Sequence, residues 1–218
     1  MKLNFWDDLD GEVERICRNT LEMFRQLGAT LVQIPFKTLR HIDVARVATT
    51  AESFLFHEPY LKERPEDYSP ALRYRLLAAQ YILATDYIRS MRVRRLIMEE
   101  IATAAREVDV MVMPTVAVPA FPIGAESIQL DGHEGTLKGT AMSMILLRNT
   151  QPMNWAGIPA ISIPAGLTSE GLPVGMQLAG APFHEAKLLS VARVIEKLIR
   201  FDAVPTALKQ GEKGNHQR

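Results

Sequence analysis

Two short apolar segments late in the chain constrain its fold more than any other feature. They read PAISIPAG (residues 159–166) and LPVGMQLAG (residues 172–180), and the sequence between them, LTSEG, favours a turn. Apolar runs of this length bounded by glycine and proline are typical of strands, and a short connection that contains glycine predicts a hairpin. The chain must therefore fold around a small sheet.

A third strand is predicted in the sequence VDVMVMPT, which begins at Val108. Residues 110–113 form a continuous apolar run, as expected for a strand that is covered on both faces in a mainly parallel sheet. Strands of this kind need helices on their faces, so the expected fold class is α/β.

Helical spacing of apolar residues is clearest at the two ends of the chain. Between Asp10 and Leu27 these residues recur every three or four positions, aspartates precede the first turn, and Gly28 ends the pattern. The next segment, TLVQIPF (residues 30–36), predicts a short edge strand. An amphipathic helix over residues 186–199 is predicted to close the fold.

The remaining segments complete a single expected domain over residues 1–205. We predict a helix over residues 43–57, a surface connection over 57–70, helical structure over 69–107, a loop without packing of its own over 129–139, a short helix over 141–147 and a disordered polar tail over 206–218. The domain then consists of a helix-strand unit (5–36), a helical region (43–107), a strand-rich segment (108–180) and a closing helix (185–200).

Composition excludes several classes of function. The 25 basic and 25 acidic residues cancel, and the densest basic stretch, around Arg92, is followed by glutamates, so a solvated helix face is favoured over a nucleic-acid site. No apolar run approaches the ~18 residues of a membrane span, and no signal core is present, so we expect a cytoplasmic protein. The single cysteine, Cys17, lies on an apolar helix face and is expected to be a buried, inert thiol.

A search for known catalytic motifs finds none. Each of the three His-Glu pairs has leucine where a zinc-protease motif needs a second histidine, and no glycine pattern fits a dinucleotide or phosphate loop. No serine stands in a Gly-x-Ser-x-Gly or Ser-x-x-Lys context, so Ser162 and Ser169 are interpreted as structural. We expect no metal and no cofactor.

The segment NTQPMNWAGIPAISIPAGLTSEGLPVGMQLAGAPFHEAKLL resembles the C-terminal part of amidase-signature enzymes. That family carries an Asn, a Gly-x-Pro, a strand that ends in Pro-x-Gly, and a Gly-Leu-Pro-x-Gly-x-Gln strand. The matching positions are Asn154, Gly157, Pro159, Pro164, Gly166, Gly171, Leu172, Pro173, Gly175 and Gln177. Similar stretches upstream extend the resemblance over residues 5–200.

The resemblance implies a mixed β-sheet flanked by helices and the hydrolysis of a carboxylic amide to an acid and ammonia or an amine. The family's Ser/Ser/Lys machinery lies in its N-terminal half, within a Gly-Gly-Ser-Ser-Gly type signature and an upstream lysine, and this sequence contains neither. No catalytic residue is therefore assigned in this chain. The expected partners are a small amide and the missing N-terminal half, and self-association is left open.

The strand-rich segment would then form one wall of the amide pocket. Our candidates for that wall are Asn149, Thr150, Asn154 and Trp155, which precede the strand in a polar stretch. The alternative has Asn154 bonding to local backbone and Trp155 in the core.

Two glycines and a leucine near that wall bear on its packing and on its substrate. Gly157 and Gly166 would let strand ends approach the missing catalytic loop. Glutamine-using members carry an aspartate where Leu147 stands, which argues against glutamine. Two further hypotheses are a non-catalytic interaction protein that keeps part of the scaffold and an unrelated α/β enzyme with a dispersed site.

Overall fold

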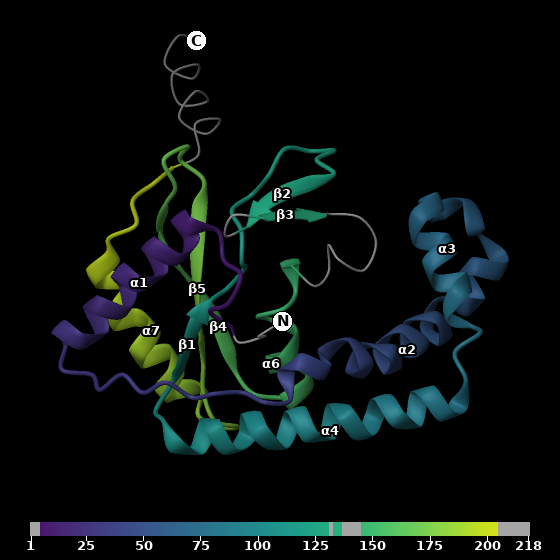
Figure 1. Cartoon of the computed structure of the whole chain (residues 1–218), viewed down its shortest axis with the longest axis horizontal. Helices are drawn as coiled ribbons and strands as arrows, with labels where there is room; N and C mark the ends of the chain where they lie inside the picture. Colours follow the sequence, from purple (N-terminus) through teal and green to yellow (C-terminus); the bar gives the residue numbers. More distant parts are fainter. Residues whose placement is uncertain (1–4, 131–132, 137–144, 205–218) are drawn as a thin grey trace, which may run out of the picture.

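The computed structural model describes residues 5–130, 133–136 and 145–204 (Figure 1). Its central sheet has the order β1-β5-β4, formed by β1 (Met111–Pro114), β5 (Pro173–Ala179) and β4 (Ala160–Leu167). The predicted hairpin is confirmed, because β4 and β5 pair directly on either side of the turn at residues 168–172. The α/β fold class is also confirmed.

The pairing within this sheet differs from the prediction of a mainly parallel sheet. Both β1 and β4 run antiparallel to β5. The apolar run that suggested a parallel strand has another cause: β1 has helices on both sides of its sheet, and burial on both faces removes the usual alternation of polar and apolar residues.

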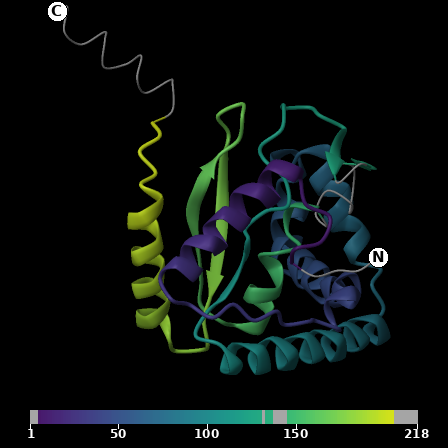
Figure 2. The ribbon, with the colours of Figure 1, turned by 60° about the vertical axis from the view of Figure 1, so that its left-hand side comes forward.

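Helices α1 (Gly11–Gln26) and α7 (Glu185–Ile199) cover one face of the sheet (Figures 1 and 2). The α1 helix begins after Asp10, whose side chain accepts hydrogen bonds from the backbone N–H groups of Glu12 and Val13. Alternate β5 residues, among them Met176 and Leu178, pack against the apolar stripes of these helices. Both predicted terminal helices are present.

The opposite face of the sheet is covered by α6 (Gln151–Ala156) and α4 (Ala84–Glu107). Ile97 and Ile101 of α4 are buried against Met153 and Trp155 of α6. Gly157 ends α6 with φ 66°, a backbone conformation that side-chain-bearing residues rarely adopt. This turn leads the chain directly into β4.

A pair of long helices extends from the sheet. Helix α2 (Ile42–Glu63) and α4 run side by side, with α3 (Pro70–Ala79) at their far end and short 3₁₀ turns at Leu39–His41 and Pro65–Asp67 (Figure 1). Ser90 of α4 links the two long helices, since its Oγ donates to Ala45 O and accepts from Ala48 N.

Two predictions for this region need correction. Helix α2 continues through Pro59, so the expected surface connection begins later than residue 57. The predicted helical stretch over 69–107 is interrupted between α3 and α4, where Gln80–Leu83 form a turn.

The predicted strand over residues 30–36 was wrong, because this segment is irregular. The outer edge of β1 is instead covered by the N-terminal segment. Trp6 Nε1 donates to Val112 O at 3.2 Å, and Asp10 N donates to Ala117 O at 2.8 Å. Residues 5–10 therefore occupy the edge that a strand over 30–36 could have joined.

The prediction of an unpacked loop over residues 129–139 was also wrong where the structure describes it. Strands β2 (Ser127–Leu130) and β3 (His133–Thr136) form an antiparallel hairpin. Leu130 is buried with Leu9, Ala117 and Val118 in a small cluster beneath it. Most of the predicted helix over 141–147 and the tail at 206–218 lie outside the described residues. Within the described ranges, no helix is long and apolar enough to span a membrane.

Candidate functional site

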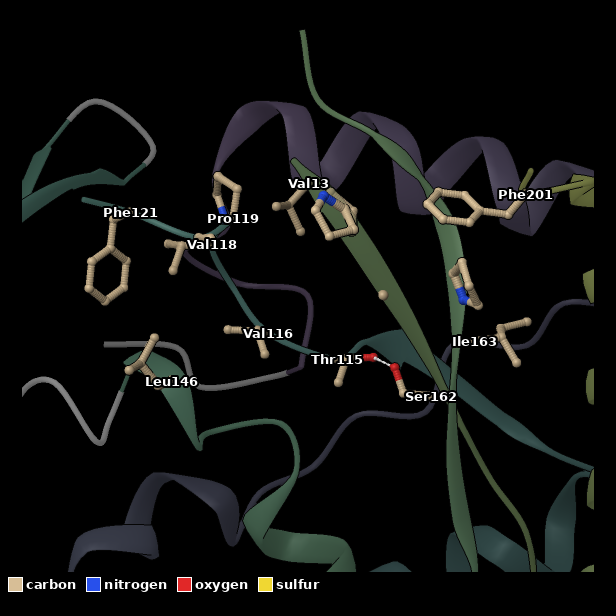
Figure 3. Close-up of a pocket in the computed structure, with 15 residues that line it drawn as sticks. Val13, Thr115, Val116, Val118, Pro119, Phe121, Leu146, Ser162, Ile163 and Phe201 are labelled. Carbon is tan, nitrogen blue, oxygen red and sulfur yellow. Dashed lines mark hydrogen bonds between the residues drawn. The ribbon is translucent and has the colours of Figure 1, made fainter. Parts of the chain in front are cut away.

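Two hydroxyl side chains meet above the middle strand of the sheet. Thr115 follows β1, Ser162 lies on β4, and their oxygens are 2.6 Å apart (Figure 3). Strand register explains the meeting: Thr115 N donates to Gly175 O, and Ser162 lies opposite Gln177, so the two outer side chains reach over the central strand.

Gly175 makes this arrangement possible because it has no side chain. A Cβ at this position would lie 2.8 Å from Ser162 Oγ and 2.9 Å from Thr115 Oγ1. Such distances are too short for a real contact, so any larger residue would displace the hydroxyl pair. A glycine within a strand marks such close approaches, and this signal in the sequence could have led to the pair.

The hydroxyl pair lines a cavity of about 510 Å³. Its remaining lining is mostly apolar and comes from α1, the segment after β1, Leu146, both strands of the hairpin and Phe201 (Figure 3). A cavity of this volume, mostly apolar with a few polar groups, has the size and character of a small-molecule site.

The chemistry that these lining residues allow is limited to binding. One hydroxyl donates to the other, which leaves one proton free to donate to a ligand. Among the described residues that line the cavity, none is a lysine, histidine or carboxylate. A hydroxyl without an adjacent base is a weak nucleophile, so these residues can hold a carbonyl group but do not activate an attack on it.

Asn149, the first predicted wall residue, is buried and fully engaged. It is 2% exposed, and its Nδ2 donates to Phe5 O at 2.9 Å and Pro114 O at 2.7 Å. Its backbone carbonyl accepts from Gln177 Nε2 at 2.8 Å. The residue therefore ties the N-terminal segment, β1 and β5 to the start of α6.

The neighbouring Arg148 is also buried. Its guanidinium donates to Asp7 O and lies near the Asp8 carboxylate. Burial lowers the pKa of Arg148, and the two aspartates oppose that shift. The cation holds the N-terminal segment against the turn at residues 147–150, a role the sequence did not suggest.

The other three predicted wall residues occupy different environments. Thr150 precedes α6 and is half-buried, whereas Asn154 is exposed on that helix. Trp155 is buried in the core between α4 and the sheet. All four residues are clustered around α6, but none of them lines the cavity with the hydroxyl pair.

Two other residues singled out in the sequence are explained by packing. Cys17 is fully buried, as expected, and burial raises the pKa of its thiol to about 12. Gly166 approaches α1, because a Cβ there would lie 3.1 Å from Ile16 Cγ2. The described part of the chain holds no cluster of three or more His, Cys, Asp or Glu side chains that could bind a metal.

Comparison with known proteins identifies the family of this chain. The family model described as Amidase matches residues 1–189. The chain belongs to the amidase family. A glutamyl-tRNA(Gln) amidotransferase subunit from Parvibaculum lavamentivorans is 31% identical, with 92% of this chain and 44% of that protein covered. An amidase from Pseudomonas putida is 30% identical, with 88% of this chain and 41% of that protein covered.

Solved structures give the same family and fold. A crystal structure of an amidase superposes on this chain with a TM-score of 0.75 at 29% identity, and covers 86% of this chain and 42% of that one. The corresponding glutamyl-tRNA(Gln) amidotransferase subunit from Thermotoga maritima has a TM-score of 0.61 at 25% identity, with 87% and 39% covered. This amidase-family chain therefore spans less than half the length of these relatives.

Proposed function

We propose that this chain forms one wall of the amide-binding site of an amidase, and that a second polypeptide portion supplies the nucleophile and its base. The two together hydrolyse a carboxylic amide to an acid and ammonia or an amine. The observation that carries this proposal is a family match over residues 1–189 combined with a span of 41–44% of the curated relatives. The chain alone would not turn over an amide.

The proposed wall lies on the sheet face that carries Ser162 and Gln177, beside α6. Asn149 would brace this wall, since its amide hydrogens are already bonded to backbone. Thr150 and Asn154, which are more accessible, would face the amide, and Trp155 would support α6 from the core. We infer a cytoplasmic enzyme, in line with the expectation from the sequence.

A neutral amide suits this wall better than glutamine. The cavity that Ser162 lines has no charged side chain among the described residues around it. Leu147 is 44% exposed and stands where the amidase-signature resemblance places an aspartate for the ammonium group of glutamine. A site without a counter-charge binds a zwitterion poorly, because the charges lose their hydration without compensation.

Transamidation is the second candidate, because several of the most similar curated relatives are amidotransferase subunits. Ammonia release measured with two substrates distinguishes the two functions. Transamidation predicts release from glutamine, whereas hydrolysis of a neutral amide predicts release from benzamide. A non-catalytic interaction protein is the third candidate, and it predicts no hydrolysis with any added portion.

The proposal can be tested in a single polypeptide. The part of the Pseudomonas putida amidase outside the match would be fused to this chain, and benzamide hydrolysis measured. We expect turnover in the fusion, a KM raised several-fold by Asn154→Ala, and no change with Glu170→Ala, which replaces an exposed turn residue. Unchanged kinetics in Asn154→Ala and in Thr150→Ala would remove these residues from the site.

A further inference from the structure

The part of the helical pair farthest from the sheet has no hydrophobic core of its own. We call residues 46–92 the distal arm; they comprise most of α2, all of α3 and the start of α4 (Figure 1). In the described ranges, buried side chains form three hydrophobic clusters, and none of these clusters includes a residue of the distal arm. Contacts among the arm's own helices and the turn at Pro65–Asp67, such as the hydrogen bond between His57 and Tyr68, therefore hold the arm.

Large apolar side chains on the distal arm are mostly exposed. Its buried apolar residues are Ala48, Leu61, Leu76 and Ala79. The exposed ones outnumber them, and they are Leu55, Phe56, Tyr60, Tyr74, Leu77, Tyr81, Leu83 and Ile88. Single exposed apolar residues are ordinary, but such a concentration marks an interaction surface.

Helix α2 shows the same feature within one element. Its first turns bury Ala45 and Ala48 against α4, whereas its later turns expose Leu55 and Phe56 at 70% each. The Phe56 ring contacts only its own helix in the ring contacts described, with His57 and Tyr60. A helix with apolar residues on several sides is typical of one that is covered on several sides.

We propose that the distal arm is the surface against which the nucleophile-bearing portion of the amidase packs. This inference rests on the proposed function. The family model includes the whole arm, so the arm belongs to the part that this chain shares with its relatives. Those relatives are more than twice as long as the matched part, so the same fold contains the material needed to cover the arm.

Binding between two separate polypeptides tests the inference. Purified chain would be titrated with the portion of the Pseudomonas putida amidase outside the match and, separately, with that of the Parvibaculum lavamentivorans protein. Complex formation would be measured by analytical ultracentrifugation and calorimetry. We expect a one-to-one complex with at least one portion, weakened roughly tenfold or more by Leu55→Lys or Phe56→Glu. Phe183→Glu, at a residue that is 90% exposed outside the arm, is the matched control and should bind normally.

Several results would overturn the inference. The first is that neither portion binds. The second is that Phe56→Glu and Phe183→Glu lose equal amounts of binding affinity. The third is that the chain alone forms a dimer that Phe56→Glu dissociates, since a second copy would then cover the arm. Amide hydrolysis is recorded on the same samples. Arm-dependent binding without hydrolysis would contradict the proposed function alone, and hydrolysis with arm-independent binding would contradict the inference alone.

Discussion

Replacing Gly175 with alanine should destabilise this fold, although a glycine-to-alanine change usually restricts the unfolded chain and so favours folding. The new methyl group would lie 2.8 Å from Ser162 Oγ and 2.9 Å from Thr115 Oγ1. Both hydroxyls sit on short side chains next to or within strands, so they can retreat only by breaking their 2.6 Å hydrogen bond or by moving the backbone.

The expected size follows from three opposing contributions. Overpacking costs about 1–3 kcal/mol, and loss of the hydroxyl pair, which is accessible to solvent, adds about 0.5 kcal/mol. The reduced entropy of the unfolded chain returns about 0.4–1 kcal/mol. Gly175→Ala should therefore lower the free energy of unfolding by about 0.5–3 kcal/mol. In a Ser162→Ala background the nearest clash is gone, and the same change should cost about 1 kcal/mol less.

Urea denaturation followed by tryptophan fluorescence measures both values. Gly11→Ala is the control, because a Cβ there meets nothing within 4 Å, and it should be neutral or slightly stabilising. Additive effects of Gly175→Ala and Ser162→Ala, or a Gly175→Ala variant as stable as the parent, would refute the close approach that we describe.

Three further predictions concern stability and reactivity. Asn149→Ala leaves two buried backbone carbonyls without a hydrogen-bond donor and should lower the free energy of unfolding, measured by urea denaturation, by about 2–4 kcal/mol. Asn154→Ala should change it by no more than about 0.5 kcal/mol. Cys17, with its thiol pKa raised to about 12, should resist a disulfide reagent at pH 8 until the chain is unfolded. The Ser169 backbone N–H lowers the pKa of Glu12, so this contact stabilises the fold above the unfolded value near 4.5. The stability difference between the parent and Glu12→Gln should therefore disappear as the pH falls below that value; a difference that persists at low pH would contradict the assignment.

Local signals in the sequence were sufficient for the elements that pack through their own pattern. Helix α1 has an aspartate cap, a regular apolar stripe and a glycine stop, and each of these is visible in the residues. The β4–β5 hairpin is likewise marked by its glycines and prolines. For these elements local preference and tertiary packing agree. The glycines and prolines of the hairpin are also the residues that carry the family resemblance.

Elements whose structure depends on distant neighbours were not predictable. The apolar pattern of residues 30–36 fits a strand, but the edge of β1 is covered by the segment around Trp6. The β2–β3 hairpin packs through Leu130 against a cluster that includes Leu9, more than 100 positions earlier in the chain. Its own sequence is rich in glycine and gives no sign of this packing. The hydroxyl pair escaped detection for the same reason, because Thr115 and Ser162 are 47 positions apart.

We propose that this chain contributes to an amide-binding site but needs a second portion for chemistry. Ammonia release from benzamide, measured for the chain alone and after addition of the unmatched portion of the Pseudomonas putida amidase, tests it most directly. We expect no release by either portion alone and sustained release by the mixture. Release by this chain alone, at a rate that the added portion does not change, would contradict it.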